Sequence, residues 1–214
     1  NLKFSQSENE KVGISKDLKR FFLTKKNWCA SSTHSSEEKF CGLVHKKLKK
    51  KYKNLVTIII PRHVNRVENI KNELEQMNLN IHLHEPKKKI NNNTDIYLVN
   101  SYGITKSFYS ICKNVFLGGS LINHGGQNPL EAVRFGCRVF HGSNVENFSE
   151  IYDFLRKNKI SNKITSHNKL IFNLEKFLSK KRGSKKEQSK IKLIGKKILD
   201  STHKEVIFTL KNEI

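Results

Sequence analysis

The sequence predicts an α/β fold built on a doubly wound, mostly parallel sheet. Strand-like and helix-like stretches alternate from residue 20 to residue 157, as is typical of βαβ units. The run Asn54–Pro61 (NLVTIIIP) is continuously apolar and rich in β-branched residues, as expected of a strand buried on both faces. A glycine-rich loop, Gly118–Gly126, lies between a short apolar run and a helical pattern. Folds of this class bind ligands at such loops.

The individual elements are predicted in chain order. The apolar run Arg20–Ser32 predicts the first strand and a turn. Ser35–Lys50 predicts a helix, because Ser35 or Ser36 can cap it and two glutamates favour its positive end. Its apolar stripe comprises Phe40, Leu43, Val44 and Leu48. Further helices are expected at about Asn65–Met77, Thr105–Cys112, Pro129–Phe135 and Asn147–Lys157, and strands at Asn54–Pro61, Asn80–His84, Asp95–Val99, Val115–Leu117 and Cys137–His141.

Three regions follow from this pattern. We expect a linker and lead-in over residues 1–19, a Rossmann-like domain over residues 20–178, and a basic C-terminal helix within residues 179–214. That helix, Ser184–Leu210, has Ile191, Ile194 and Ile198 on one face. No strand follows it, so it must pack elsewhere or leave the domain. The Lys/Ser-rich stretch Ser179–Lys186 is the internal linker candidate.

The charge balance favours an anionic partner. Lys and Arg total 41 against 19 Asp and Glu, giving a formal net charge of +22 over 214 residues. Nucleic acid, phospholipid headgroups and phosphorylated substrates all fit such a balance. The lysines are spread in runs among many Asn and Ile residues, which is also typical of an AT-rich genome, so both interpretations stay open. Signatures of a recognition helix, a zinc finger or an aromatic platform are absent from the sequence, so nucleic acid is not an expected partner.

Cysteine spacing and hydropathy argue against a zinc-binding, membrane-spanning or secreted protein. The four cysteines have no zinc-binding spacing, which predicts free, buried thiols in a reducing compartment. No apolar run approaches the ~18 residues of a membrane span, and no signal peptide is evident. The chain begins at Asn1 without a methionine. We therefore expect it to be part of something longer.

Two short polar segments follow predicted strands. Ser31-Ser32-Thr33-His34 offers hydroxyl groups and an imidazole that can donate to a phosphate or carboxylate, although such turns also serve as helix caps. Pro61-Arg62-His63 puts two cationic side chains directly after the most apolar strand. The alternative for this second segment is a surface turn with solvated charges.

The segment Val115–Glu131 (VFLGGSLINHGGQNPLE) carries the strongest motif. Its two Gly-Gly pairs let a ligand approach the backbone closely. Glu131, in the first turn of the next helix, either stabilises the helix dipole or accepts hydrogen bonds from a ribose diol. The segment lacks the Gly-Lys-Ser/Thr of a P-loop and the GxGxxG of a dinucleotide site. A nucleotide-sugar site late in the sheet fits better.

Here the sequence resembles a known family. The pattern GGSLxxxGGxNPLE, followed by a strand and NxxNF at Asn144–Phe148, is similar to the C-terminal domain of bacterial 3-deoxy-D-manno-octulosonic acid (Kdo) transferases, which are GT-B glycosyltransferases. Trp28–Glu38 (WCASSTHSSEE), Pro61–His63 (PRH) and the opening Asn1–Phe4 (NLKF) also resemble it, so the likeness covers nearly the whole chain. Family members commonly have His in place of Gln127, Glu-Gly in place of Ser35-Ser36, and an acidic residue in place of Ile104.

The resemblance implies an activity, a location and partners. It implies binding of CMP-Kdo and inverting transfer of Kdo to a lipid A precursor, in lipopolysaccharide biosynthesis at the cytoplasmic face of the bacterial inner membrane. No metal or cofactor is expected. The acceptor wall and the catalytic base would belong to an N-terminal domain missing from this chain, and the final helix would pack onto that domain. An anionic membrane surface is a further candidate partner. The alternatives are another GT-B nucleotide-sugar transferase, an epimerase of like fold, or a basic membrane- or nucleic-acid-binding module.

The same resemblance assigns the site. Arg62, assisted by His63, would stabilise the leaving phosphate or bind the Kdo carboxylate, and Glu131 would bind the ribose hydroxyl groups. Backbone N–H groups of the glycine loop would line the anion pocket. The expected substrate-binding residues are Ser32, Thr33, His34, His63, Gly118, Gly119, Ser120, Gly125, Gly126, Gln127, Asn128 and Glu131.

Overall fold

A computed structural model describes residues 13–85, 88–179 and 185–212. Within them, seven parallel strands form one sheet in the order β3-β4-β2-β1-β5-β6-β7, so the predicted doubly wound α/β fold is confirmed. The opening NLKF segment lies outside the described residues. The strands are β1 (Lys26–Thr33), β2 (Leu55–Pro61), β3 (Ile81–Leu83), β4 (Ile96–Leu98), β5 (Asn114–Leu117), β6 (Arg138–His141) and β7 (Ser161–Lys163).

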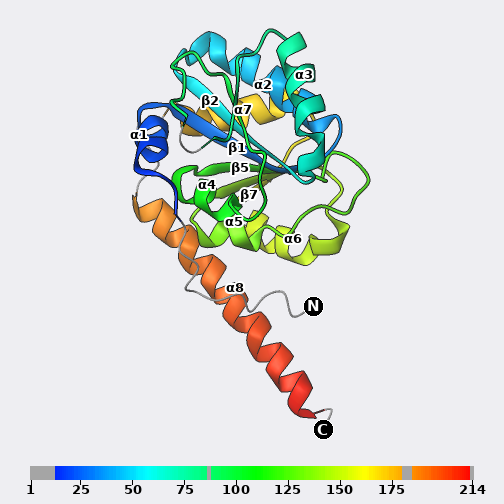
Figure 1. Cartoon of the computed structure of the whole chain (residues 1–214). Helices are drawn as coiled ribbons and strands as arrows, with labels where there is room; N and C mark the ends of the chain where they lie inside the picture. The colour runs from blue at the N-terminus through cyan, green and yellow to red at the C-terminus, as the bar shows by residue number, and fades with distance from the viewer. Residues whose placement is uncertain (1–12, 86–87, 180–184, 213–214) are drawn as a thin grey trace.

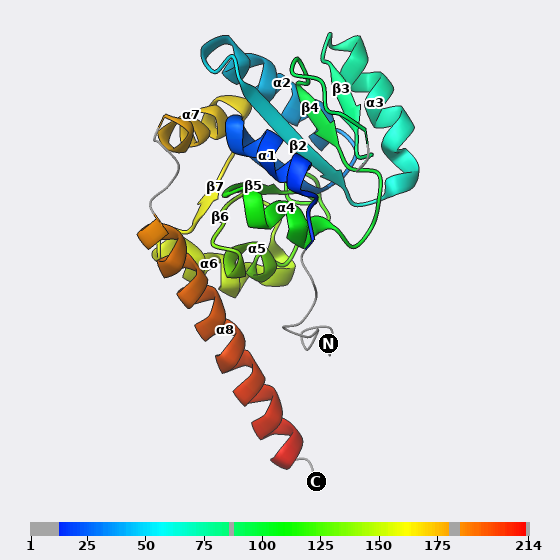
Figure 2. The ribbon, with the colours of Figure 1, turned by 60° about the vertical axis from the view of Figure 1, so that its left-hand side comes forward.

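Helices cover both faces of the sheet (Figures 1 and 2). One face packs against α2 (Glu37–Lys51), α3 (Val67–Gln76) and α7 (His167–Leu178). The other packs against α1 (Lys16–Thr24), α4 (Thr105–Ile111), α5 (Leu130–Arg134), α6 (Ser149–Lys157) and the start of α8 (Lys185–Asn212). Two short 3₁₀ helices, η2 (Val64–Arg66) and η3 (Glu146–Phe148), precede α3 and α6. Every residue of β2 is buried, as the apolar run predicts.

The predicted strand over Arg20–Ser32 is wrong at its start. Residues up to Thr24 belong to helix α1, which crosses the boundary expected between residues 19 and 20. The Ser15 side chain caps this helix by accepting a hydrogen bond from the N–H of Leu18. Leu18 and Phe22, one helical turn apart, are both buried against the sheet. The apolar residues of this stretch thus follow the period of a helix.

Helix α8 corrects a second expectation. Ile191, Ile194 and Ile198, predicted to pack onto a missing domain, pack instead against the core of this one. The helix comes close to the end of α5, where a Cβ on Gly195 would lie 3.0 Å from Val133 Cγ1 and one on Gly136 would lie 2.9 Å from the Gln188 carbonyl oxygen. The rest of α8 extends away from the sheet (Figure 1).

The other predicted features agree with the structure. The remaining predicted helices and strands are present with small shifts of their ends, and β7 and α7 are additional elements. Gly136 ends α5 with a φ of 76°. All four cysteines are free and buried, as predicted. None of the described helices is both long enough and apolar enough to span a membrane.

A buried polar network joins α2 to the sheet. The Asp95 carboxylate accepts hydrogen bonds from the N–H and side-chain amide of Asn80, both at 3.0 Å, and lies 3.0 Å from Lys49 Nζ and 3.3 Å from His45 Nε2. His45 Nδ1 lies 2.8 Å from Thr57 Oγ1. Burial alone raises the pKa of Asp95, but the hydrogen bonds from His45, Asn80 and Lys49 outweigh it and hold the pKa well below its usual value.

We predict that Asp95→Asn lowers the free energy of unfolding by about 1–3 kcal/mol at neutral pH, because buried donors lose a charged acceptor. A depressed pKa stabilises the fold above the unfolded pKa of about 4, and this stability is lost as the pH falls below that value. The difference between wild type and variant should therefore shrink below about pH 4 in urea unfolding experiments. Glu175→Gln, which removes a half-exposed ion pair with Lys51, is the control and should change little. A difference independent of pH would contradict the role of the charge.

Candidate functional site

The predicted site segments meet at the carboxyl edge of the sheet. Strands β2 and β5 lie on either side of β1, so the chain reverses its direction of winding between β1 and β5. Ligands bind in the crevice outside this switch point in open α/β sheets. The N–H of Gly118, after β5, donates to the Ser31 carbonyl at 2.8 Å, and the N–H of Arg62, after β2, donates to the Thr33 carbonyl at 2.9 Å. The three predicted segments are therefore adjacent.

The segment after β1 is tightly folded. Ser32 has a φ of 55°, at an irregularity in the register between β1 and β2. Thr33 is fully buried, and His34 is 8% exposed. Among the residues that the structure describes, the buried Nε2 of His34 has no hydrogen-bond partner. Burial, helped by the neighbouring His124 and His63, lowers the pKa of His34 to about 4, so its imidazole is neutral at pH 7.

Three imidazoles gather at this edge from three different loops. The ring of His34 lies 4.2 Å, centroid to centroid, from that of His124 and 5.9 Å, edge to face, from that of His63. Arg62 and His63 are exposed. Within the described part of the chain, Arg62 forms no ion pair. The exposed guanidinium of Arg62 and the exposed imidazole of His63 thus lie beside the buried, neutral imidazole of His34.

Arg66 is a neighbour that the motifs did not single out. Its guanidinium donates to both carboxylate oxygens of Glu38, at 3.0 and 3.1 Å. Glu38 is fully buried, and this burial raises its pKa against the hydrogen bonds from Arg66. Arg66 is one of the cationic groups that lower the pKa of His34. A buried carboxylate thus fixes a second arginine beside the segment that contains Arg62 and His63.

The glycine loop is held by an internal carboxylate. The buried side chain of Glu37 accepts hydrogen bonds from the N–H groups of Gly119 at 2.8 Å, Ser120 at 3.2 Å and Leu121 at 3.0 Å. It also accepts from the N–H of His34 at 3.0 Å. Sequence reasoning assigned this glutamate only to the helix dipole. The four donors lie in two loops far apart in the chain.

The predicted backbone anion pocket is therefore wrong at three glycines. The N–H of Gly119 donates to Glu37, that of Gly118 to Ser31, and that of Gly126 to the Gly119 carbonyl. These amides already have acceptors inside the protein, so they do not face a ligand. The N–H groups of Gly125 and Gln127 stay as predicted donors.

Ser120 also differs from its predicted role. Its side chain is fully buried, donates to the Leu117 carbonyl at 2.5 Å and accepts from the Gly142 N–H at 2.8 Å. Its carbonyl accepts from the N–H of Asn144 at 3.0 Å. Ser120 thus joins the ends of β5 and β6 and is a structural residue.

The remaining motif residues begin α5. Asn128 Oδ1 accepts the N–H of Leu130 at 2.9 Å, which leaves its amide N–H₂ for a ligand. Glu131 has a side chain 45% exposed and lies 3.8 Å from Lys106 Nζ. The Gln127 carbonyl accepts from Tyr152 at 2.8 Å. A Cβ built on Gly119 would lie 3.3 Å from Gln127 Nε2, so this side chain lies over the glycine loop.

The structure also has a cavity outside these segments. A cavity of about 520 Å³ lies beside α1, lined by Phe21, Ile90 and Tyr97 among others, away from the converging segments. In the described ranges, no group of three or more His, Cys, Asp or Glu side chains has the arrangement of a metal site.

Comparison with known proteins finds sequence relatives among the Kdo transferases. A 3-deoxy-D-manno-octulosonic acid transferase of Haemophilus influenzae is 35% identical over 128 residues, which cover 60% of this chain and 30% of that protein. The corresponding enzyme of Aquifex aeolicus is 27% identical over 166 residues, covering 78% and 46%. The predicted resemblance to the Kdo transferases is confirmed. No family model matches the chain, and it spans less than half the length of these Kdo transferases.

A solved structure supports the fold. The C-terminal CMP-Kdo binding domain of WaaA from Acinetobacter baumannii superposes with a TM-score of 0.73 at 22% identity, covering 84% of this chain and 91% of that domain. The C-terminal domain of a glycosyl transferase group 1 family protein (LpcC) from Francisella tularensis has a similar fold, with a TM-score of 0.52 at 14% identity, covering 90% of this chain and 95% of that domain. The likeness to Kdo transferases in sequence thus agrees with the likeness in fold.

Proposed function

We propose that this chain is the donor-binding half of a Kdo transferase and that it binds CMP-Kdo. The convergence of His34, Arg62, His63 and the glycine loop at the switch point of the sheet supports this proposal most directly. The choice of CMP-Kdo as donor substrate rests on the similar domain from Acinetobacter baumannii, which is described as binding CMP-Kdo. Residues 20–178, together with α1, would form the nucleotide-sugar domain.

Arg62 is the main group proposed to act on the phosphate. Cleavage of the bond from Kdo to CMP leaves negative charge on the phosphate, and fixed cations placed where charge develops are effective stabilisers. The exposed guanidinium of Arg62 is available for this role, with His63 beside it. The alternative role for the same pair is to bind the Kdo carboxylate.

The nucleotide would lie along the start of α5. Asn128 and Glu131 are proposed to contact it, with Glu131 accepting hydrogen bonds from the ribose. Ser32, Thr33 and His34 would face the donor from the loop after β1, and Gly125 and Gln127 from the loop after β5. The N–H groups of Gly118, Gly119 and Gly126 are already bonded. Gly118 is also packed against the Ser32 carbonyl oxygen, so close approach of the ligand remains proposed only at Gly119 and Gly126.

The acceptor side of the reaction would come from a second domain. We propose that an N-terminal domain supplies the acidic base and the site for a lipid A precursor, and that transfer inverts the anomeric centre without metal or cofactor. The reaction would occur at the cytoplasmic face of the bacterial inner membrane, in lipopolysaccharide biosynthesis. The main alternative is a GT-B transferase or epimerase that uses another nucleotide sugar.

We predict that CMP, but neither UDP nor single-stranded RNA, raises the melting temperature of the chain. Arg62→Ala and Glu131→Ala should each weaken CMP binding by about 1.5–3 kcal/mol, the usual range for hydrogen bonds to charged groups. Isothermal titration calorimetry measures the change. Arg156→Ala, which removes an exposed cation on α6, is the control and should bind CMP normally. Unchanged affinity in both test variants would refute the assignment.

A second prediction concerns transfer. These residues alone should bind CMP or CMP-Kdo weakly and transfer no Kdo, because loss of a general base costs ~10²–10⁴-fold and loss of acceptor positioning adds to it. Adding the N-terminal domain of a Kdo transferase, as a fusion or a separate chain, should restore transfer to a lipid A precursor. Product formation is followed by mass spectrometry. Efficient transfer by the chain alone would place the acceptor wall within these residues.

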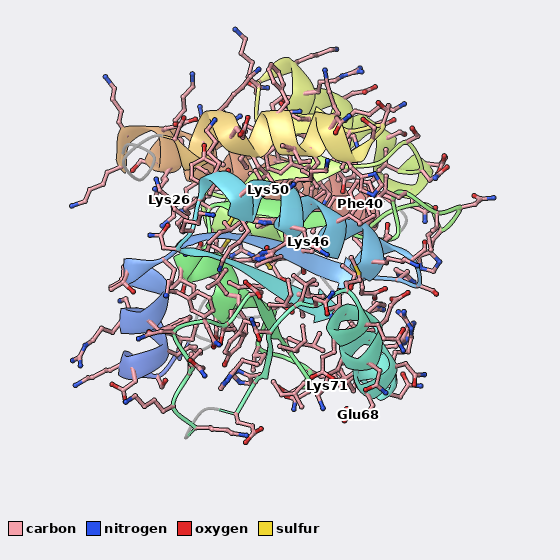
Figure 3. The ribbon with its side chains drawn as sticks, turned by 90° about the horizontal axis from the view of Figure 1, so that it is seen from above. Lys26, Phe40, Lys46, Lys50, Glu68 and Lys71 are labelled. Atoms are coloured by element: carbon pink, nitrogen blue, oxygen red, sulfur yellow. The ribbon has the colours of Figure 1, made fainter. Side chains whose placement is uncertain are left out.

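A third prediction concerns the lysine-rich surface. Helix α2, next to α7 (Figure 3), exposes Lys46, Lys47 and Lys50. If this charge helps the protein bind anionic lipid, vesicle binding should fall steeply as salt rises, since each cation near the surface contributes ~1 kcal/mol before screening. Replacing the three lysines with Gln should reduce binding in a sedimentation assay. Equal binding to neutral and anionic vesicles would instead indicate a compositional bias.

A further inference from the structure

The Glu37 carboxylate joins the two loops that form the centre of the site. It is completely buried at the first residue of α2 and accepts four backbone N–H groups at 2.8–3.2 Å. One donor is His34, in the loop after β1, and the other three are consecutive residues of the glycine loop after β5. Gly118, just before them, has no room for a side chain, because a Cβ there would lie 2.7 Å from Glu37 Oε2. Glu37 is thus the common acceptor of both loops.

The residues that Glu37 holds support the proposed ligand-binding side chains. A Cβ built on Gly119 would lie 3.1 Å from His124 Cδ2, 3.3 Å from Gln127 Nε2 and 3.3 Å from His34 Nε2. Three side chains therefore converge over the residue whose N–H Glu37 accepts. His34 is bound to Glu37 in a second way as well, since its carbonyl accepts the N–H of Glu37 at 3.0 Å. Glu37 thus bonds the backbone of His34 and of Gly119, the residue over which the side chains of His124 and Gln127 lie.

Consecutive backbone N–H groups that converge on one point form an anion-binding nest. In this protein the anion is part of the chain, so the nest is already occupied. A ligand anion must then be bound by side chains placed around the filled nest. The buried Nε2 of His34, which lacks a partner in the described part of the chain, is such a group.

We propose that Glu37 is a positioning residue for donor binding, which fixes His34, His124 and Gln127 by occupying the amide nest of the glycine loop. This inference rests on the proposed binding of CMP-Kdo. Glu37 itself would not touch the donor. Its negative charge, surrounded by four N–H groups, keeps the two loops together whether or not a ligand is bound.

The test compares Glu37→Gln, Glu37→Ala and Glu37→Asp with wild type. The Gln variant keeps the volume but replaces one acceptor oxygen with a donor, so CMP affinity should fall by roughly tenfold to a hundredfold, as when orienting groups are removed from other sites. The Ala variant should lose at least as much affinity, and acetate, which can fill the emptied nest, should restore part of it. Asp95→Asn, which alters a buried carboxylate in a separate network, should bind CMP normally despite its lower stability.

Histidine resonances in NMR spectra provide a readout that does not depend on CMP. The His34 and His124 signals should shift in Glu37→Gln and return toward wild type in Glu37→Ala when acetate is added. If wild type does not bind CMP, the proposed function fails, and the NMR comparison still tests positioning. Unchanged histidine signals, or a folded Glu37→Gln with wild-type CMP affinity, would overturn the inference. So would acetate that restores stability without restoring CMP affinity. Glu37→Asp keeps the carboxylate but is one methylene shorter, so it should hold the amides less well and lose CMP affinity. If the Gln and Ala variants do not fold, wild-type CMP affinity in Glu37→Asp would overturn the inference.

Discussion

The ring of hydrogen bonds around Glu37 is the constraint on which the rest of the site depends. An ionised carboxylate without solvent is costly unless it is well hydrogen-bonded, and four N–H groups satisfy this one. The same carboxylate gives an acceptor to four backbone N–H groups, three of them buried, and a buried N–H group without an acceptor would be costly. Strands β1 and β5 are already paired in the sheet, and because the donors come from the loops that follow them, the contact holds these two loops together. The position of His34 relative to the glycine loop follows from it.

This constraint bears on how the proposed site would recognise an anion. In P-loops and related sites the backbone amides bind the ligand phosphate directly. Here the amides of Gly119, Ser120 and Leu121 bind Glu37, so an anion at the proposed site would have to be recognised by side chains around the loop. The side chain of Arg62 is exposed, whereas that of Arg66 forms an ion pair with the buried Glu38. Two arginines in the segment after β2 thus differ in their surroundings: Arg62 is open to solvent, and Arg66 is fixed within the structure.

Much of the fold could be predicted because its signals are local. The apolar run of β2 and the position of the glycine loop between a strand and a helix can be recognised from neighbouring residues, and the ligand edge follows from the parallel topology. The role of Glu37 as a hydrogen-bond acceptor could not be predicted, because two glutamates at the start of a helix look the same in sequence whether they face solvent or a loop 82 residues away. Strand β7 is short and polar, which leaves no periodic signal. The end of helix α1 was predicted as strand because its apolar residues lie directly before strand β1.

The distribution of acidic residues explains how so basic a chain builds this site. Only 19 residues are Asp or Glu against 41 Lys and Arg, yet Glu37, Glu38 and Asp95 are all buried. Each is satisfied by several donors that are themselves in or next to the core, so the interior uses negative charge to fix loops and helices. The surface is left with a still larger excess of positive charge. An anionic ligand approaching the carboxyl edge would therefore meet an attractive field, while the charges of the buried Glu37 and Glu38 are satisfied by hydrogen bonds inside the protein. Attraction and geometry are thus supplied by different residues, and a change in the surface lysines should alter the rate of encounter more than the shape of the site.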